Sequence, residues 1–220
     1  MSTSHQVVTA DYPENRQRGI MICGIDYGYS SEDEAAETTQ SAAAPVAAER
    51  KSFISDSSVR KSDKFRARML RWLDSWGVKL ESEPGKETRT ERAYFQTNWI
   101  DEQNHKNSGP VDLLVSNSEG FLGLLAQRQP RVVLFGGVNL IEALNDSRIL
   151  DDVESILGPR PGNPEIHRGQ TTGGATAFKV MRQVWPKTTV VSLPHPTGTR
   201  GLSDAYMAQF ASLLKPILAE

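Results

Sequence analysis

The chain has 220 residues, a length that fits one large domain or two small ones. Its single cysteine, Cys23, excludes an intrachain disulfide, a cysteine-ligated iron–sulfur cluster and a multi-cysteine zinc site. The net charge of −2 by itself argues against a nucleic-acid partner, because most nucleic-acid-binding domains are basic. That total combines opposed blocks: residues 1–50 contain eight acidic and three basic residues, whereas residues 50–71 contain eight basic and two acidic ones.

The histidines and the apolar runs narrow the class of protein further. The four histidines are scattered without a close pair, so we expect no metal site; they are His5, His105, His167 and His195. No apolar run approaches the roughly 20 residues of a membrane span, and the polar N-terminus lacks the apolar stretch of a signal peptide. We therefore expect a cytoplasmic protein with no membrane partner.

The N-terminal part of the chain is predominantly polar. Residues 1–18 are aperiodic, which predicts a flexible N-terminal arm, and residues 19–220 are expected to form a single domain. This domain begins with a continuous apolar run of strand length at residues 19–25. Residues 31–49 are acidic and then rich in alanine, so we expect a polar insertion there, either a solvated loop or a short helix.

Residues 62–76 carry the clearest helical pattern in the chain. Large apolar side chains recur there at helical spacing, and Gly77 follows as a stop signal. These apolar residues are Phe65, Met69, Trp72, Leu73 and Trp76. Off the apolar stripe lie four basic residues, Lys64, Arg66, Arg68 and Arg71.

The middle of the chain alternates predicted strands and helices. A strand is predicted at residues 93–98, and a weaker helical pattern, interrupted by two glycines, follows over residues 111–126. Residues 131–135 form a third predicted strand. Gly136-Gly137 then opens a helix that extends to about residue 144.

The C-terminal third supplies the remaining predicted elements. Residues 146–172 are rich in glycine and proline, which predicts a surface excursion. Residues 178–184 are expected to be helical, and the β-branched run at residues 188–193 predicts a fourth strand. Ser203 is the predicted N-cap of a final helix.

Four apolar strands alternating with helices predict an α/β fold. We expect a three-layer α/β/α sandwich around a central four-stranded, mostly parallel sheet. Ligands in such folds bind outside the carboxyl ends of the strands. Chemistry is therefore expected in the segments that follow the four strands, at residues 24–31, 97–99, 136–137 and 194–200.

Two side chains in these segments suit acid–base chemistry. Asp26 lies in a Gly-x-Asp-x-Gly turn, where a carboxylate activates water or stabilises a developing cation; the alternative is a turn aspartate that caps its own loop. His195 lies between two prolines and, as a neutral donor, suits an anionic leaving group. The alternative for His195 is a rim histidine bonded to the backbone.

Further residues suit a nucleotide. The amide of Asn98 offers the paired donor and acceptor that match a nucleobase edge, although a strand-end asparagine commonly starts an Asx turn. Phe53 is either a stacking surface for a base or an ordinary core residue. The basic block at residues 50–71 either contacts phosphates or forms a solvated helix face. Arg200 is either a phosphate-binding residue or an ordinary surface arginine.

Several common nucleotide-binding and hydrolase motifs are absent. Gly136-Gly137 can present backbone amides to an anion, but the Gly-Lys-Ser/Thr of a Walker loop does not follow. The chain also lacks the G-x-G-x-x-G fingerprint and the G-x-S-x-G elbow. These absences argue against an NTPase, a Rossmann dehydrogenase and an α/β-hydrolase.

Taken together, these positions resemble the uracil-DNA glycosylase superfamily. Residues 23–31 are similar to the first motif of its mismatch-specific branch, Gly-Ile-Asn-Pro-Gly-x-Ser-Ser, with Asp26 replacing Asn and Tyr27 replacing Pro. Aspartate at that position is typical of the classical uracil branch. Residues 195–198 resemble the second motif, His-Pro-Ser-x, and residues 131–144 resemble the strand–Gly–helix unit before the last strand.

The resemblance implies a DNA glycosylase that hydrolyses the N-glycosidic bond of uracil or a related damaged base by base flipping. Asp26 would position water and stabilise the oxocarbenium-like sugar, and His195 would stabilise the departing base anion. The implied substrate-binding residues are Gly24, Ile25, Tyr27, Gly28, Phe53 and Asn98, with Phe53 stacking on the base and Asn98 reading its edge. The implied DNA-binding residues are Thr197, Gly198, Thr199 and Arg200.

The resemblance also bears on selectivity and partners. Gly28 stands where the classical branch has a tyrosine that blocks the thymine methyl, so strict selectivity for uracil is not expected. The implied partner is single- or double-stranded DNA containing a damaged base, with no cofactor, and we expect a monomer. Two alternatives stay open: an inactive superfamily fold that binds nucleic acid, nucleotide or another partner, and a small-molecule hydrolase that uses Asp26 and His195 as base and acid.

Overall fold

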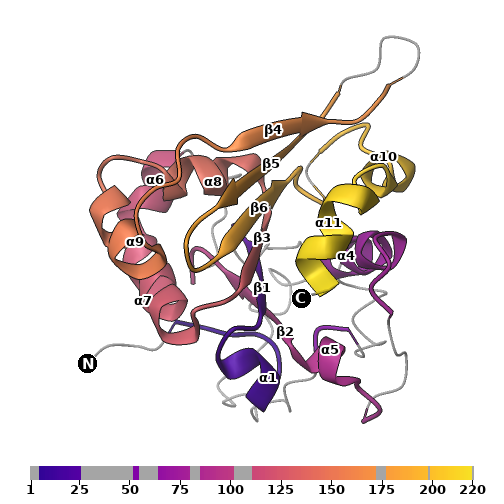
Figure 1. The fold of residues 1–220 in the computed structure, drawn as a ribbon, viewed down its shortest axis with the longest axis horizontal. Coiled ribbons are helices and arrows are strands. Elements are labelled where there is room, and N and C mark those ends of the chain that lie inside the picture. The colour runs from indigo at the N-terminus through magenta and orange to yellow at the C-terminus, as the bar shows by residue number, and fades with distance from the viewer. Residues whose placement is uncertain are drawn as a thin grey trace, which may run out of the picture.

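The computed structural model describes residues 5–25, 52–54, 64–79, 85–101, 111–171, 177–197 and 199–219. These residues form an α/β fold with a six-stranded, mostly parallel sheet flanked by helices (Figure 1). The strands in spatial order are β2 (Tyr94–Asn98), β1 (Ile20–Gly24), β3 (Val132–Gly136), β6 (Thr189–Leu193), β5 (Lys179–Val184) and β4 (Glu165–Arg168). The first four are parallel to one another, whereas β5 and β4 each pair antiparallel with the preceding strand.

The four predicted strands are the four parallel ones. Every residue of β1, β2 and β3 is buried, which explains why β1 and β3 read as continuous apolar runs rather than alternating ones, whereas β2 ends in three polar residues. The expected total of four strands is wrong, because residues 179–184 form β5 instead of a helix and residues 165–168 form β4. In so short a run, the buried residues Val180, Met181 and Gln183 fit both the helical and the strand spacing. Pairing with β6 determines that the segment is a strand.

The segment at residues 146–172, expected to be a surface excursion, also contains regular structure. Helix α9 (Leu150–Leu157) packs Val153 and Leu157 into the core, and β4 follows it. The predicted surface character holds for the strand, whose Ile166 is 49% exposed. The glycines and prolines lie mainly between these two elements, so they mark a connection rather than the whole segment.

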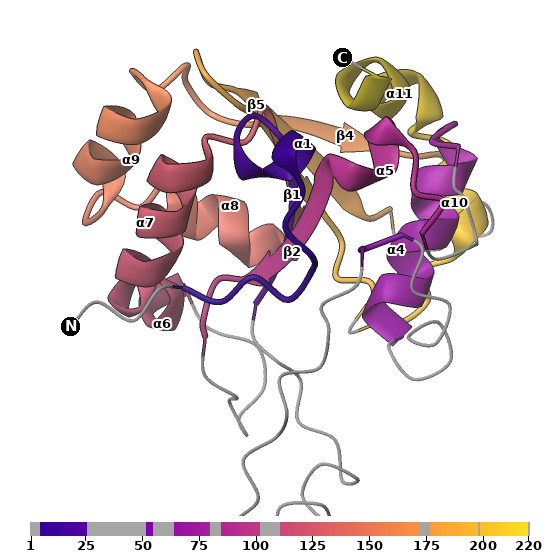
Figure 2. The same ribbon diagram turned by 90° about the horizontal axis from the view of Figure 1, so that it is seen from below.

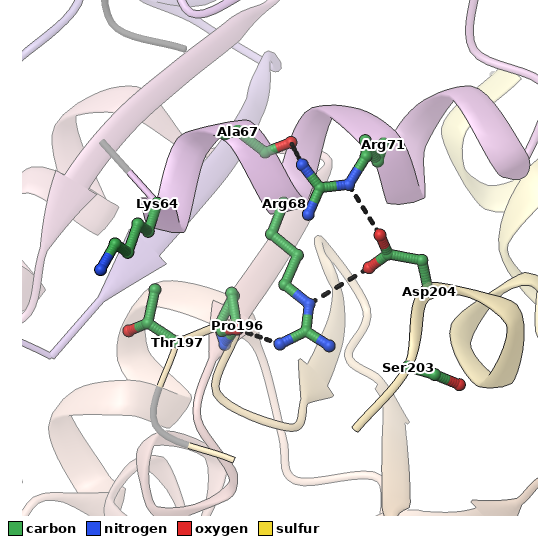
Figure 3. A pocket seen from close by; sticks show the side chains of 8 residues that line it. All are labelled: Lys64, Ala67, Arg68, Arg71, Pro196, Thr197, Ser203 and Asp204. Atoms are coloured by element: carbon green, nitrogen blue, oxygen red, sulfur yellow. Dashed lines mark hydrogen bonds and ion pairs between the residues drawn. The ribbon is translucent and has the colours of Figure 1, made fainter. Parts of the chain in front are cut away.

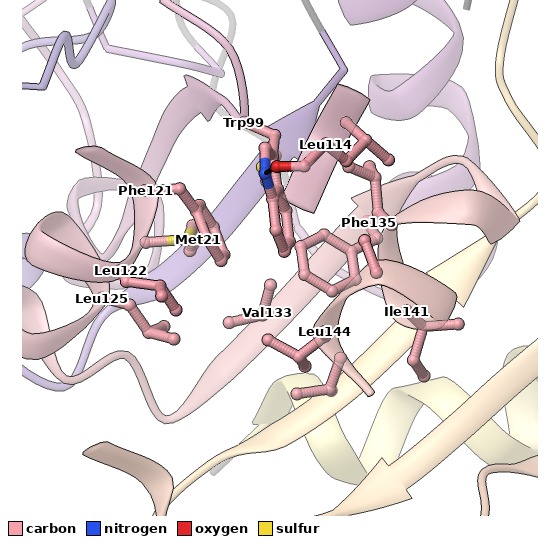
Figure 4. Close-up of a cluster of buried hydrophobic side chains, with 14 of the residues drawn as sticks. Met21, Trp99, Leu114, Phe121, Leu122, Leu125, Val133, Phe135, Ile141 and Leu144 are labelled. Carbon is pink, nitrogen blue, oxygen red and sulfur yellow. Dashed lines mark hydrogen bonds between the residues drawn. The ribbon is translucent and has the colours of Figure 1, made fainter. Parts of the chain in front are cut away.

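Helices cover both faces of the sheet, because successive strand side chains point to opposite sides (Figure 2). One core contains Met21, Phe95 and Phe135 under α6 (Val111–Ser116), α7 (Ser118–Arg128), α8 (Val138–Leu144) and α9. In this core Trp99 stacks on Phe121 with ring centroids 4.1 Å apart, and its indole N–H donates to the Leu114 carbonyl at 2.7 Å (Figure 4).

The second core lies on the other face. It contains Ile22, Leu134 and Val191 under α4 (Lys64–Ser75), α10 (Asp204–Ala208) and α11 (Ala211–Ala219). The predicted helix at residues 62–76 is confirmed as α4. Ser203 is confirmed as an N-cap, since its hydroxyl accepts from the Tyr206 N–H at 3.1 Å, but the final helix divides into α10 and α11.

Residues 5–18 do not form the free arm that their polarity predicted. The Val8 N–H donates to the Gln96 carbonyl at 3.0 Å, and the Gln96 N–H donates to the Thr9 hydroxyl at 3.1 Å. Short helix α1 (Pro13–Arg16) follows, and a second one, α5 (Arg89–Arg92), precedes β2. The N-terminal segment thereby covers the outer edge of β2, which would otherwise present unpaired backbone groups. Every helix in the described part of the chain falls short of the length and apolar character that crossing a bilayer requires.

Candidate functional site at the strand ends

The carboxyl ends of the four parallel strands meet at one edge of the sheet. In the register of these strands, Gly24 pairs with Asn98 and Gly136 pairs with Leu193. His195 follows two residues after the end of β6. The topology therefore brings Asn98 and His195, which are far apart in sequence, to the edge where the sequence predicted chemistry.

Two strand-end glycines shape the α4 face of this edge. A Cβ on Gly24 would lie 2.3 Å from the Asn98 Oδ1 atom, and a Cβ on Gly136 would lie 2.5 Å from Cε2 of Phe65. Both distances are far inside van der Waals contact. Gly24 and Gly136 therefore give the Asn98 amide and the Phe65 ring, which belongs to the first turn of α4, the space they occupy over the strand ends.

The amide of Asn98 is the most informative group at the site. Asn98 is only 5% exposed, yet its side chain has no hydrogen-bond partner among the described residues. Its backbone is fixed, because the Asn98 carbonyl lies 2.7 Å from Nε2 of His5. The amide is not among the fully buried polar groups that lack a partner in the described part of the chain, so it stays accessible at the strand ends. A ligand that enters there can pair with both the donor and the acceptor of this amide.

His195 lies beside the Phe65 ring, with ring centroids 6.0 Å apart. The Thr197 backbone N–H donates to Nδ1 of His195 at 3.3 Å, and the Thr197 hydroxyl lies at the same distance. Nδ1 therefore accepts, which places the proton of the neutral ring on Nε2. Burial lowers the pKa of His195 below its usual 6.5, so the imidazole is neutral at pH 7 and retains one N–H donor.

The backbone next to Asp26 is held by the two residues that follow β2. The Trp99 and Ile100 N–H groups donate to the Gly24 and Ile25 carbonyls, each at 2.9 Å, and Ile25 is buried. Asp26, Tyr27 and Gly28 themselves lie outside the described residues, as does Gly198. The chain is thus fixed up to the residue that precedes the predicted catalytic carboxylate.

Phe53 occupies a different environment from the one expected of a stacking residue. It is fully buried, and the Arg66 guanidinium lies over its ring at 5.3 Å while donating to Oε1 of Gln96. No ring face of Phe53 is open in this arrangement, which fits the alternative of a core residue. The aromatic ring at the strand ends is that of Phe65, which sequence reasoning assigned only to the apolar stripe of its helix. Gly136 at the end of β3 was the signal that a large side chain lies close to the backbone there.

A basic pocket adjoins the site between α4 and the chain that follows β6 (Figure 3). Its volume is about 560 Å³, and it is lined by Lys64, Ala67, Arg68, Arg71, Pro196, Thr197, Ser203 and Asp204. The predicted DNA-binding residues lie along the same chain segment: Thr197 and Arg200 are exposed, and Thr199 is half-buried. Sequence reasoning placed the basic residues correctly on one helix but did not find Asp204 as their partner.

Asp204 ties the two sides of this pocket together. Its carboxylate accepts from Nε of Arg68 at 3.1 Å, from Nε of Arg71 at 2.7 Å and from the Trp72 indole at 2.8 Å. Arg68 also donates to the carbonyls of Pro196, at 2.6 Å, and Leu202. Burial alone would raise the pKa of Asp204, but the donors from Arg71, Trp72 and Arg68 outweigh it and hold the pKa below its usual value, so the group is ionised.

The assignment of a function to this site depends on its geometry, because no protein-family model matches the chain and no curated protein matches it. Within the described segments, no three His, Cys, Asp or Glu side chains gather in a way that could hold a metal ion. The groups on which a function can be argued are the amide of Asn98, the neutral imidazole of His195, the Phe65 ring and the basic pocket.

Proposed function

We propose that the protein is a DNA glycosylase that removes uracil or a related damaged base by base flipping. The observation that carries this proposal is the amide of Asn98, which lies at the carboxyl edge of the sheet and makes no hydrogen bond to another described residue. A pyrimidine presents neighbouring donors and acceptors on its Watson–Crick edge, which an asparagine amide matches with its own donor and acceptor. Reading a base in this way requires the nucleotide to leave the stack and enter a pocket.

The neighbours of Asn98 fit the same chemistry. The Phe65 ring lies over the strand ends and offers an apolar surface to a flat base. The neutral His195 carries its proton on Nε2, and donation from that atom would stabilise the negative charge on a departing base. In this proposal Asp26, two residues after Gly24, positions the water and stabilises the oxocarbenium-like sugar.

The proposed family is the uracil-DNA glycosylase superfamily. Support comes from the four parallel strands, from Asn98 at the end of β2 and from His195 after β6, in the order that the motifs led us to expect. The proposed partner is DNA, bound along the chain from His195 to Arg200 and acted on by a monomer in the cytoplasm. An inactive member of the superfamily that binds DNA without cleaving it is the alternative, since Tyr27 departs from the first motif.

Incubation with damaged oligonucleotides tests the proposal. Single- and double-stranded DNA containing uracil, hypoxanthine or ethenocytosine is mixed with stoichiometric protein, and abasic product is measured after alkaline cleavage. We expect product with at least one of these bases and its loss in Asp26→Asn. Binding without product from any base would support the inactive alternative, and the absence of both binding and product would exclude both.

A further inference from the structure

The basic pocket beside the strand ends has the composition of an anion site. Lys64, Arg68 and Arg71 are spaced four and three residues apart, so they share one face of α4 (Figure 3). Like charges at this spacing destabilise a helix. Asp204 is the only acidic residue among the described residues that line the pocket, so it offsets one of the three charges. The lining side chains carry a net charge of about +2 at pH 7.

The three cations have different tasks. The Arg68 guanidinium donates hydrogen bonds to Asp204 and to two backbone carbonyls, so it holds the chain after β6 against α4. Arg71 is 57% exposed and donates from Nε to Asp204 and from Nη1 to the Ala67 carbonyl, which leaves its Nη2 group. Lys64 is exposed and has no ion pair with any described residue. Lys64 and Arg71 are therefore the pair able to bind an anion in the pocket.

The pocket lies next to the proposed base site. Pro196 and Thr197 line it, and the Thr197 N–H is bonded to Nδ1 of His195. A nucleotide in a DNA strand carries a phosphate on each side of its sugar, so a base held near His195 brings a phosphate to its surroundings. Arginine and lysine are the side chains that bind phosphate oxygens by charge-assisted hydrogen bonds.

We propose that Lys64 and Arg71 bind a phosphate group in this pocket, and that in the protein's action this phosphate belongs to the DNA strand beside the flipped nucleotide. The assignment to DNA rests on the proposed function. The same chemistry fits the phosphate of a free nucleotide, so the experiment includes both sources. Arg68 and Asp204 form the frame that holds the two sides of the pocket together.

The test compares two double variants that each remove two positive charges. Lys64→Ala/Arg71→Ala alters the pocket, and Lys79→Ala/Arg168→Ala removes an exposed lysine after α4 and an exposed arginine on β4. Binding is measured for an oligonucleotide with an abasic-site analogue over a range of salt, for inorganic phosphate and for deoxyuridine monophosphate. Circular dichroism checks that both variants are folded.

We expect the pocket variant to lose about tenfold or more in DNA affinity at low salt. The slope of log affinity against log salt should become shallower by about 0.7–0.9, the contribution of one phosphate contact. The control variant should lose less DNA affinity and less of the salt dependence than the pocket variant. Loss of phosphate and nucleotide binding alone, with equal DNA binding in both variants, would uphold the anion site and contradict its assignment to DNA. Equal behaviour of the two variants toward all three probes, or no binding by the wild type, would overturn the proposal.

The same experiment separates this inference from the proposed function. A pocket variant that loses DNA binding, in a protein that forms no abasic product, would uphold the phosphate site and contradict the glycosylase. A wild type that forms abasic product, with a pocket variant indistinguishable from the control, would uphold the glycosylase and contradict the phosphate site.

Discussion

The contact between Gly24 and Asn98 gives the sharpest test of the site's geometry. In Gly24→Ala the new Cβ would lie 2.3 Å from Oδ1 of Asn98, whereas ordinary van der Waals contact begins near 3.4 Å. The amide must therefore move by about 1 Å. The backbone of Gly24 does not have a positive φ, so alanine is not strained there for any other reason. Overpacking of this kind costs about 1–3 kcal/mol of folding free energy.

Removal of the asparagine side chain should cancel that cost. In Asn98→Ala/Gly24→Ala the next neighbour of the new Cβ is Cζ of Phe65, at a comfortable 4.0 Å. Residues in direct contact show coupling energies of about 0.5–3 kcal/mol, and we expect about 1–2 kcal/mol here. Urea denaturation of the wild type, the two single variants and the double variant gives this value, provided that the slope m is unchanged. Free-energy changes that simply add would refute the arrangement of Asn98 over Gly24.

Three further predictions concern the surrounding groups. Gly136→Ala places a Cβ 2.5 Å from Cε2 of Phe65, so urea denaturation should show a loss of about 1–3 kcal/mol, and an unchanged midpoint would contradict the position of the ring. Asp204→Asn should lower the free energy of unfolding by about 1 kcal/mol at pH 7, a modest value because the carboxylate is 40% exposed. Because the folded pKa of Asp204 is lowered, this difference is fully present above pH 3.8 and should shrink as the pH falls through the folded pKa; a constant difference would contradict the assigned pairs. NMR titration should give a pKa of His195 below 6.5, and a value above 6.5 would contradict the burial of the ring. Because the folded pKa is lowered, the contribution of the neutral ring to folding stability is present above pH 6.5 and is lost as the pH falls through the folded pKa.

The parallel core of the fold follows from the sequence because its strands are buried on both faces. Residues 19–25 and 188–193 are apolar or β-branched runs of strand length, which indicate buried strands of a parallel sheet, and they form β1 and β6. The antiparallel strand β5 has no such signal, since its buried residues also fit a helix and pairing with β6 determines its conformation. The N-terminal segment looked free because its contacts with β2 are made through backbone atoms, which composition does not reveal.

The candidate site was predictable to the extent that strand ends are predictable. Asn98 ends one predicted strand and His195 follows another, and parallel pairing brings them to one edge of the sheet. The choice between Phe53 and Phe65 depends on tertiary contacts: Arg66 covers the first ring, and Gly136 makes room for the second. The partnership of Arg71 with Asp204 joins residues 133 positions apart, which no local pattern encodes.

The rate of abasic-site formation in a single turnover tests the central claim most directly. Asn98→Ala removes the amide that is proposed to read the base, whereas the matched control Asn163→Ala removes an amide from an exposed loop residue. With a substrate that the wild type cleaves, we predict a loss on the order of 100-fold in Asn98→Ala, as expected for one transition-state hydrogen bond, and an unchanged rate in the control. Equal rates in both variants, or no abasic product from the wild type with any of the damaged bases, would contradict the account.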